Sequence, residues 1–65
     1  MAKRMKQSAD VVEEWIRQVN EEASKPLTSW EESFMISITD QFERIRYLTD
    51  DQVDSLERIY SQKTN

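Results

Sequence analysis

The 65-residue chain contains no cysteine, no histidine and no glycine, and it has a single proline, Pro26. Without cysteine and histidine it has no disulfide, no thiol nucleophile, no imidazole base and no zinc site of the usual kind. Without glycine it lacks the loops that cradle phosphate groups and the tight turns that join β-strands. These absences exclude most catalytic and cofactor sites, so we expect a protein without cofactors or metals that is not an enzyme.

Long apolar runs are also absent from the sequence. No segment approaches the roughly 20 apolar residues that cross a bilayer, and no apolar run follows the basic start of the chain, as a signal peptide requires. A chain this short buries only about 60% of its unfolded surface and forms one domain at most. We therefore expect a cytoplasmic protein without membrane contact, with a flexible basic leader at 1–7, a single helical domain at 8–62 and a frayed tail at 63–65.

Acidic residues outnumber basic ones, with thirteen Asp and Glu against nine Lys and Arg. Three of the basic residues, Lys3, Arg4 and Lys6, lie in the leader, which is more typical of a solubilising terminus than of a phosphate-binding one. Residues 8–65 therefore carry six basic and thirteen acidic residues, a net charge of −7. Nucleic-acid phosphates repel a surface of this sign. The excess either maintains solubility or forms a surface that meets a basic partner.

Two matched segments, Leu27-Thr28-Ser29-Trp30-Glu31 and Leu48-Thr49-Asp50-Asp51-Gln52, predict where helices begin. In each, a Thr side chain caps the first turn while Glu or Gln three residues later accepts a hydrogen bond from the Thr backbone N–H, an arrangement called a capping box. They predict helices over 29–46 and 50–62. A further helix is expected from Ser8 or Asp10 to about Ala23, and it ends before Pro26 because proline pushes the preceding residue out of the helical region.

Apolar residues recur at helical spacing in all three segments, which predicts an all-α fold, a compact three-helix bundle. The alternative is a helical hairpin of the last two segments, with the first docked on it or on a second subunit. Acid–base pairs four residues apart stabilise each helix by about 0.2–0.5 kcal/mol per pair, and they are Glu13/Arg17, Asp40/Arg44 and Asp54/Arg58. The residues expected to face inward are Val11, Val12, Trp15, Ile16, Val19, Ala23, Trp30, Phe34, Ile38, Phe42, Ile45, Val53, Leu56, Ile59 and Tyr60, with Met35 at the edge of its stripe.

Carboxylates are neighbours in the sequence at several points, as Asp50 and Asp51 are. Neighbours in a helix point in different directions, so such pairs do not form an acid–base dyad. With Asp54 and Glu57 these residues have neither the glycine turn nor the alternating ligands of a calcium loop. Their place at the start of a helix, where the helix dipole favours acids, explains them without a metal ion.

Large apolar side chains are the candidates for an apolar contact. Trp15 and Trp30 are large for so small a core, and we expect both inside it. A partly exposed Trp would instead be a binding anchor, because Trp is enriched at interface hot spots. Ile36 falls opposite the apolar stripe of its helix, and with Met35 it defines a predicted contact patch. Exposure of Trp15, Trp30 or Ile36 would favour an apolar interface over an acidic one.

The segment from Leu27 to Lys63 carries a pattern of caps and core positions made up of Trp30-Glu31, Phe34, Ser37, Gln41, Arg44, Leu48-Thr49, Gln52, Leu56-Glu57 and Ile59-Tyr60. This pattern resembles a short helical module of small phage and prophage proteins, a module also appended to phage DNA-metabolism proteins. It departs from the module at Ile45, a position that the module commonly fills with Gly, and this predicts a different end to the second helix. The resemblance covers a little over half of the chain and implies a phage source, but it implies no activity.

Together these features lead to the hypothesis of a non-enzymatic phage-type binding protein that inhibits or modulates a host nucleoprotein machine, such as a CRISPR defence nuclease. Its acidic helix faces would occupy Lys/Arg-lined grooves meant for DNA or RNA, and binding would weaken as salt rises. The alternatives are an accessory module that docks a phage replication or recombination enzyme through Met35 and Ile36, or a structural homodimer. The predicted acidic contact residues are Glu13, Glu14, Glu21, Glu22, Asp50, Asp51, Asp54 and Glu57.

Overall fold

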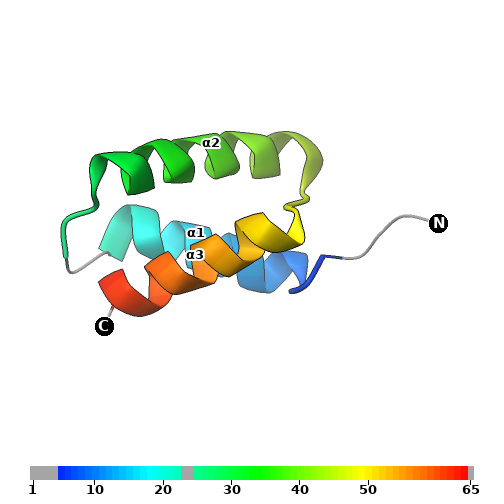
Figure 1. Ribbon diagram of the computed structural model, residues 1–65. Coiled ribbons are helices and arrows are strands. Elements are labelled where there is room, and N and C mark those ends of the chain that lie inside the picture. The colour runs from blue at the N-terminus through cyan, green and yellow to red at the C-terminus, as the bar shows by residue number, and fades with distance from the viewer. Residues whose placement is uncertain (1–4, 23–24, 65) are drawn as a thin grey trace.

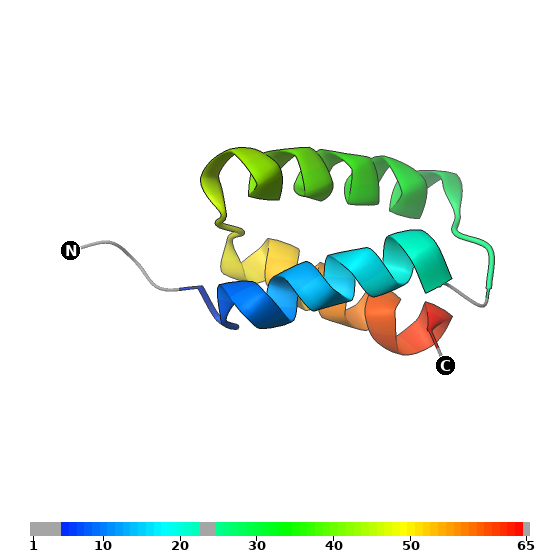
Figure 2. The same cartoon turned by 180° about the vertical axis from the view of Figure 1, so that it is seen from behind.

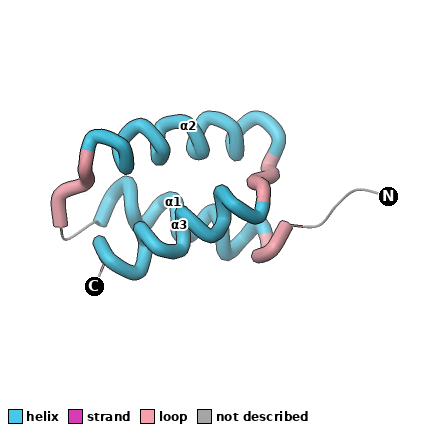
Figure 3. Tube along the Cα trace, viewed as in Figure 1, coloured by secondary structure: helices cyan, strands magenta, loops and turns pink. Residues whose placement is uncertain are grey.

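The computed structural model describes residues 5–22 and 25–64. In this part of the chain three α-helices form the fold: α1 (Ala9–Glu22), α2 (Ser29–Ile45) and α3 (Asp50–Lys63). α1 and α3 run side by side in the same direction, and α2 runs antiparallel along one side of both (Figure 1, Figure 2). A short loop joins α2 to α3, and the described residues include no strand (Figure 3). The predicted three-helix bundle is confirmed.

Both predicted capping boxes are present. At the start of α2, the Glu31 N–H donates to Thr28 Oγ1 at 3.1 Å, and the Thr28 N–H donates to Glu31 Oε1 at 2.8 Å. At the start of α3, the same two bonds join Gln52 and Thr49 at 3.2 and 2.9 Å. Each box satisfies backbone donors that the helix itself leaves unpaired, so both helices begin where the sequence predicts.

The remaining helix ends lie close to their predicted positions. Ser8 rather than Asp10 caps α1, because the Val11 N–H donates to Ser8 Oγ at 3.3 Å. α3 continues to Lys63, one residue beyond its predicted end. The predicted last residue of α1, Ala23, lies outside the described residues, as does position 65 of the predicted tail.

α2 ends at a left-handed residue that is not glycine. Arg46 has φ 54° and ψ 35°, and its N–H still donates to Phe42 O at 2.9 Å. A residue with a Cβ atom is strained in this conformation by about 1–2 kcal/mol. The Arg46 guanidinium carbon lies 4.6 Å from the centre of the Phe42 ring, and Nη1 lies 3.5 Å from Glu13 Oε2 of α1. These two contacts offset part of the strain in a chain that has no glycine to place there.

The core joins all three helices, and α1 and α3 are the most closely packed pair. Trp15 of α1 stacks on Tyr60 of α3 with ring centres 5.5 Å apart. The molecule is therefore not a hairpin of α2 and α3 with α1 added to it, which was the alternative architecture. The buried apolar residues are Val12, Ile16, Val19, Met35, Ile38, Phe42, Leu48, Val53, Leu56 and Ile59, and of these Leu48 lies in the loop before α3.

The inward face of α2 differs from the predicted one. Met35, Ile38 and Phe42 form it, whereas Trp30 and Ile45 are 63% and 61% exposed. The prediction that Trp30 and Ile45 belong to the core is therefore wrong. Met35, predicted at the edge of the stripe, is fully part of the core at 2% exposure.

Glu31, the residue after Trp30 in the first turn of α2, contacts the end of α3. The Glu31 carboxylate, already held by the capping box, lies 3.5 Å from Lys63 Nζ, and these side chains are only 13% and 16% exposed. Lys63 Nζ also donates to Pro26 O at 3.3 Å. This sheltered ion pair joins the start of α2 to the end of α3, and the exposed Trp30 side chain points about 100° away from Glu31 around the helix.

Part of the predicted leader contacts the bundle. The Leu48 N–H donates to the sulfur of Met5 at 3.2 Å, and Lys6 Nζ donates to Asp54 Oδ1 at 2.6 Å. Residues 1–4, with the other two basic residues of the leader, lie outside the described part of the chain. Met5 and Lys6 therefore join the segment before α1 to α3 and to the loop that precedes it.

Candidate functional site

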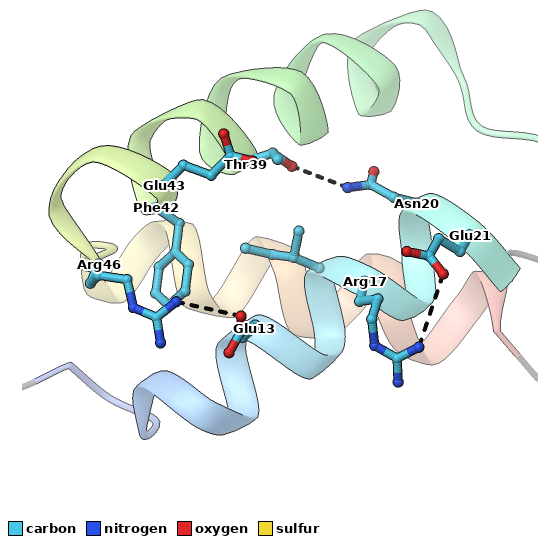
Figure 4. Close-up of a pocket in the computed structure, with 9 residues that line it drawn as sticks. Glu13, Arg17, Asn20, Glu21, Thr39, Phe42, Glu43 and Arg46 are labelled. Carbon is cyan, nitrogen blue, oxygen red and sulfur yellow. Dashed lines mark hydrogen bonds and ion pairs between the residues drawn. The ribbon is translucent and has the colours of Figure 1, made fainter.

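The side of the bundle formed by α1 and α2 contains a groove of about 240 Å³. Glu13 and Glu21, two of the predicted contact acids, line this groove together with Arg17 and Arg46. Figure 4 shows Arg46 beside the Phe42 ring and reaching Glu13, and Arg17 reaching Glu21. These ion pairs are 3.5 and 4.0 Å long. The charges of the groove are thus balanced largely within the chain.

A neutral contact between two residues that line the groove joins α1 to α2, in which Asn20 Nδ2 donates to Thr39 Oγ1 at 3.2 Å (Figure 4). Across the part of the chain that the structure describes, no three Asp or Glu side chains are arranged so that they could hold a metal ion. Within the same residues, no helix has the length and apolar character needed to cross a bilayer.

Arg17 also binds the other two predicted contact acids of α1. Its Nη2 lies 2.6 Å from Glu14 Oε2, and its Nη1 lies 3.9 Å from Glu22 Oε2. Gln18 donates to the same Glu14 oxygen at 2.6 Å. The hydrogen bond from Arg17, followed by that from Gln18, holds the pKa of Glu14 below its ordinary value. All four predicted acids of α1 therefore have a cationic partner in the chain, which reduces the negative charge that they offer to another protein.

Three acids of α3 lie together on the side that α3 shares with α1. Asp54, Asp50 and Glu57 all raise the pKa of Lys6, and the largest effect is the 2.6 Å hydrogen bond from Lys6 Nζ to Asp54 Oδ1. Their spacing of four and three residues places them on one face of the helix. Asp51 is also exposed, but its side chain points about 100° away from that of Asp50 around the helix axis, because consecutive residues of a helix are about 100° apart. It therefore does not belong to the same face. We call Asp50, Asp54 and Glu57 the acidic face.

The predicted apolar patch of Met35 and Ile36 does not form. Met35 is 2% exposed and belongs to the core, whereas Ile36 is 72% exposed. The two are consecutive in α2 and point about 100° apart, so they do not share a surface. Met35 is therefore corrected from a contact residue to a core residue, and Ile36 remains as an isolated apolar side chain on the outer side of α2.

A different surface of α2, which the sequence did not single out, combines an exposed aromatic ring with few charges. The residues recur at spacings of three, four and seven and so share one face of the helix. We call this surface the Trp30 strip, and its residues are Trp30, Ser33, Ser37, Gln41, Arg44 and Ile45.

The contacts of the Trp30 strip show which way it faces. Gln41 Nε2 donates to Tyr47 O and to Gln52 Oε1, each at 3.0 Å, so the strip lies on the side of α2 nearest to α3. Trp30 stacks on Phe34 with ring centres 5.2 Å apart. Within the strip, a shallow hollow of about 400 Å³ is lined by Ser37, Asp40, Gln41, Arg44 and Ile45, and Arg44 pairs with Asp40 at 3.1 Å as predicted.

The fold and these surfaces define a small all-α bundle with an acidic face, a charge-balanced groove and a weakly charged strip. Comparison of the chain with family models, with curated proteins and with solved structures finds no match. The resemblance of Leu27 to Lys63 to a phage module therefore stays a prediction.

Proposed function

We propose that this chain is a non-enzymatic binding protein that uses its acidic face to occupy a basic, nucleic-acid-binding surface of another protein. The observation that carries the proposal is the position of Lys6, whose ammonium group lies 2.6 Å from Asp54 and interacts with Asp50 and Glu57. The chain itself thus provides an example of the basic side chain that this face accepts. A Lys/Arg-lined groove for DNA or RNA presents several such groups in a row.

In the expected binding step, basic side chains of the partner displace Lys6 from the acidic face. The Lys6 and Asp54 side chains are each about half exposed, and exposed ion pairs of this kind are weak. An array of several cations therefore competes well against one lysine. Charge complementarity across such an interface speeds association and fixes specificity more than it raises affinity, and added salt screens it.

The target class follows from the resemblance of Leu27 to Lys63 to a phage module. A phage protein of this size that occupies a nucleic-acid site would act in the host cytoplasm as an inhibitor or modulator of a host nucleoprotein machine. Counter-defence of the anti-CRISPR kind is the role we propose within that class. No direct contact between the acidic body and nucleic acid is expected, because both are negative.

The experiment is affinity capture from a bacterial lysate at low and high salt, with bound proteins identified by mass spectrometry. The wild-type protein is expected to capture nucleic-acid-binding proteins at low salt and to release them at high salt. Two triple variants remove three charges each, one from the acidic face and one from the α1–α2 groove as a matched control: D50N/D54N/E57Q and E13Q/E21Q/E43Q.

The two variants distinguish the effect of the acidic face on capture from the effect of net charge alone. Only the acidic-face variant should lose capture, while circular dichroism shows that both retain the helical fold. Equal loss in both variants would mean that total charge rather than the acidic face is responsible. Capture that persists at high salt would contradict the proposal outright.

The exposure of Trp30 and Ile36, at 63% and 72%, is the feature that was expected to favour an apolar interface, and it supports a second candidate function. The acidic face remains the first because a basic side chain of the chain, Lys6, already binds it, whereas Trp30 and Ile36 lie on different sides of α2. An accessory module that docks an enzyme of phage DNA replication or recombination would use such apolar anchors. Its capture would resist high salt, survive the acidic-face substitutions and be lost with Trp30→Ala. A structural homodimer is the third alternative, and the Trp30 strip is the surface on which it depends.

A further inference from the structure

The Trp30 strip has the composition of an interface centre. Of its six residues Arg44 alone is charged, and the Asp40 carboxylate pairs with it at the edge of the strip, whereas 34% of the whole chain is charged. Depletion of charge together with an exposed aromatic residue distinguishes the centres of protein interfaces from ordinary surface. The Trp30 ring is also held in place by its stack on Phe34, with the two planes 11° apart. Little side-chain freedom is therefore lost when a partner covers it.

The strip contains both a projecting ring and a hollow. The hollow begins at Ser37 and extends to Ile45, so its centre lies about 16 Å along the helix from Trp30. All of its lining residues belong to α2. Ring and hollow are therefore a fixed distance apart on one rigid element, and every copy of the chain presents both.

We propose that the Trp30 strip is the interface of a twofold-symmetric dimer in which Trp30 of each copy enters the hollow of the other. Trp30 and Arg44 each lie seven residues from Ser37. When two α2 helices cross antiparallel with the twofold axis at Ser37, Trp30 of one copy lies opposite Arg44 and Ile45 of the second. The reverse contact forms at the same time. Self-complementary contacts of this kind are the commonest in homo-oligomers.

Side-chain size and charge both fit this arrangement. Ser33 and Ser37 are small, so two helices can approach to the usual 8–10 Å between their axes. The Arg44 guanidinium of one copy faces the Trp30 ring of the other, a favourable cation–π pair. Arg44 keeps its 3.1 Å ion pair with Asp40 on the rim of the hollow. The contact thus places a cation and an aromatic ring together without leaving an unpaired charge inside it.

Repulsion between copies is smallest on this side of the molecule. Each chain has a net charge of −4, but the acidic face lies on the side between α1 and α3, and most acids of α1 are paired in or beside the α1–α2 groove. Screening of the remaining repulsion by salt is expected to strengthen the dimer. The effect of salt is thus opposite to its effect on a contact made through the acidic face.

The area available indicates a weak dimer. The strip runs from residue 30 to residue 45, about 22 Å of helix. A standard stable interface buries about 800 Å² on each partner, which is about a sixth of the 4601 Å² surface of one chain. One helix against another covers less than that, so we expect a dissociation constant in the micromolar range, at the weak end of what standard interfaces show.

Cysteine cross-linking tests the twofold axis directly, because the chain has no cysteine of its own. Ser37→Cys lies on the axis and faces the same residue of the second copy, whereas Ile36→Cys is an exposed neighbour on another side of α2. Under mild oxidation at about 100 μM, S37C is expected to form a covalent dimer at least about tenfold faster than I36C, since the local concentration at the axis is millimolar. Equal rates would overturn the proposed axis.

Sedimentation equilibrium tests whether Trp30 holds the two copies together. The wild-type mass should rise from 7.8 kDa toward twice that value as concentration increases through the dissociation constant. Trp30→Glu should remain monomeric, whereas Ile36→Glu, which places the same charge at another exposed apolar position, should dimerise like the wild type. A wild type that stays monomeric up to about 500 μM, well above the expected constant, would overturn the dimer.

The dimer and the acidic-face interaction succeed or fail separately. Loss of dimerisation in Trp30→Glu leaves Asp50, Asp54 and Glu57 untouched, and the acidic-face variant leaves the Trp30 strip intact. Circular dichroism of each variant confirms that a change in mass or in capture does not come from unfolding.

Discussion

Met35 and Ile36 are consecutive in α2, and the structure predicts opposite consequences for their truncation. Met35→Ala removes a side chain that is 2% exposed, and Ile36→Ala removes one that is 72% exposed. Truncation of a buried Met costs about 2–5 kcal/mol, because its transfer free energy is lost and a cavity remains. Ile36→Ala opens no cavity, so its unfolding free energy should stay within about 0.5 kcal/mol of the wild-type value.

These differences are large relative to the stability of a small protein. At about 0.05–0.15 kcal/mol per residue, a chain of this length has an unfolding free energy on the order of 3–10 kcal/mol. For a domain of this size 1 kcal/mol shifts Tm by about 4–8 °C, so Met35→Ala should lower Tm by about 10 °C or more. Thermal and urea unfolding followed by far-ultraviolet circular dichroism measures both variants. Equal costs, or a larger cost for Ile36→Ala, would refute the inward face assigned to α2.

Two further substitutions test the ends of α2. Glu31→Gln keeps an acceptor for the Thr28 N–H, as Gln52 does in the second capping box, but removes the charge. The hydrogen bond from Thr28 and the proximity of Lys63 hold the pKa of Glu31 below its ordinary value of 4.5, so its stabilisation is complete above pH 4.5 and is lost as the pH falls through the lowered pKa. The urea midpoint of the variant should therefore fall less steeply with acid, and parallel pH profiles would exclude this role. Arg46 has φ 54°, a conformation that glycine adopts without strain. In urea unfolding, the Arg46→Gly variant should therefore be more stable than Arg46→Ala by about 1 kcal/mol, which is the reverse of the order found inside a helix. A more stable Arg46→Ala variant would contradict the left-handed conformation.

Helix starts could be predicted from the sequence because the interactions that fix them are local. The Thr28 and Thr49 boxes join residues three apart, and such pairs are recognisable without knowledge of the fold. The Asp40/Arg44 pair, four residues apart within one helix, is likewise confirmed. Fold class followed from the same local signals together with the spacing of the apolar residues.

Side-chain environments set by contacts between elements could not be predicted in this way. Glu13 was expected to pair with Arg17, but it pairs with Arg46, which the end of α2 brings near α1. Asp54 was expected to pair with Arg58, but Lys6 reaches it from the segment before α1. The positions of these cations determine which acids keep an unbalanced charge.

The inward face of α2 was predicted incompletely for a related reason. Its periodicity allows both a stripe centred on Trp30 and Phe34 and one centred on Met35 and Ile38. In the structure Met35 and Ile38 are buried, and the Glu31–Lys63 ion pair on the same side of α2 joins residues 32 positions apart and has no signature in the local sequence. The Trp30 strip was not predicted, because the apolar spacing in the sequence placed Trp30 in the core.

The stacking of Trp15 on Tyr60 has a consequence for how the protein is made. The first and last helices of the described chain are the most closely packed pair, so neither α1 with α2 nor α2 with α3 contains the closest contact of the bundle. Contacts between such distant segments form only after a long loop has closed, which slows folding relative to a bundle stabilised by adjacent helices. During synthesis, the nascent chain therefore lacks this contact until α3 has left the ribosome, so the bundle does not fold helix by helix.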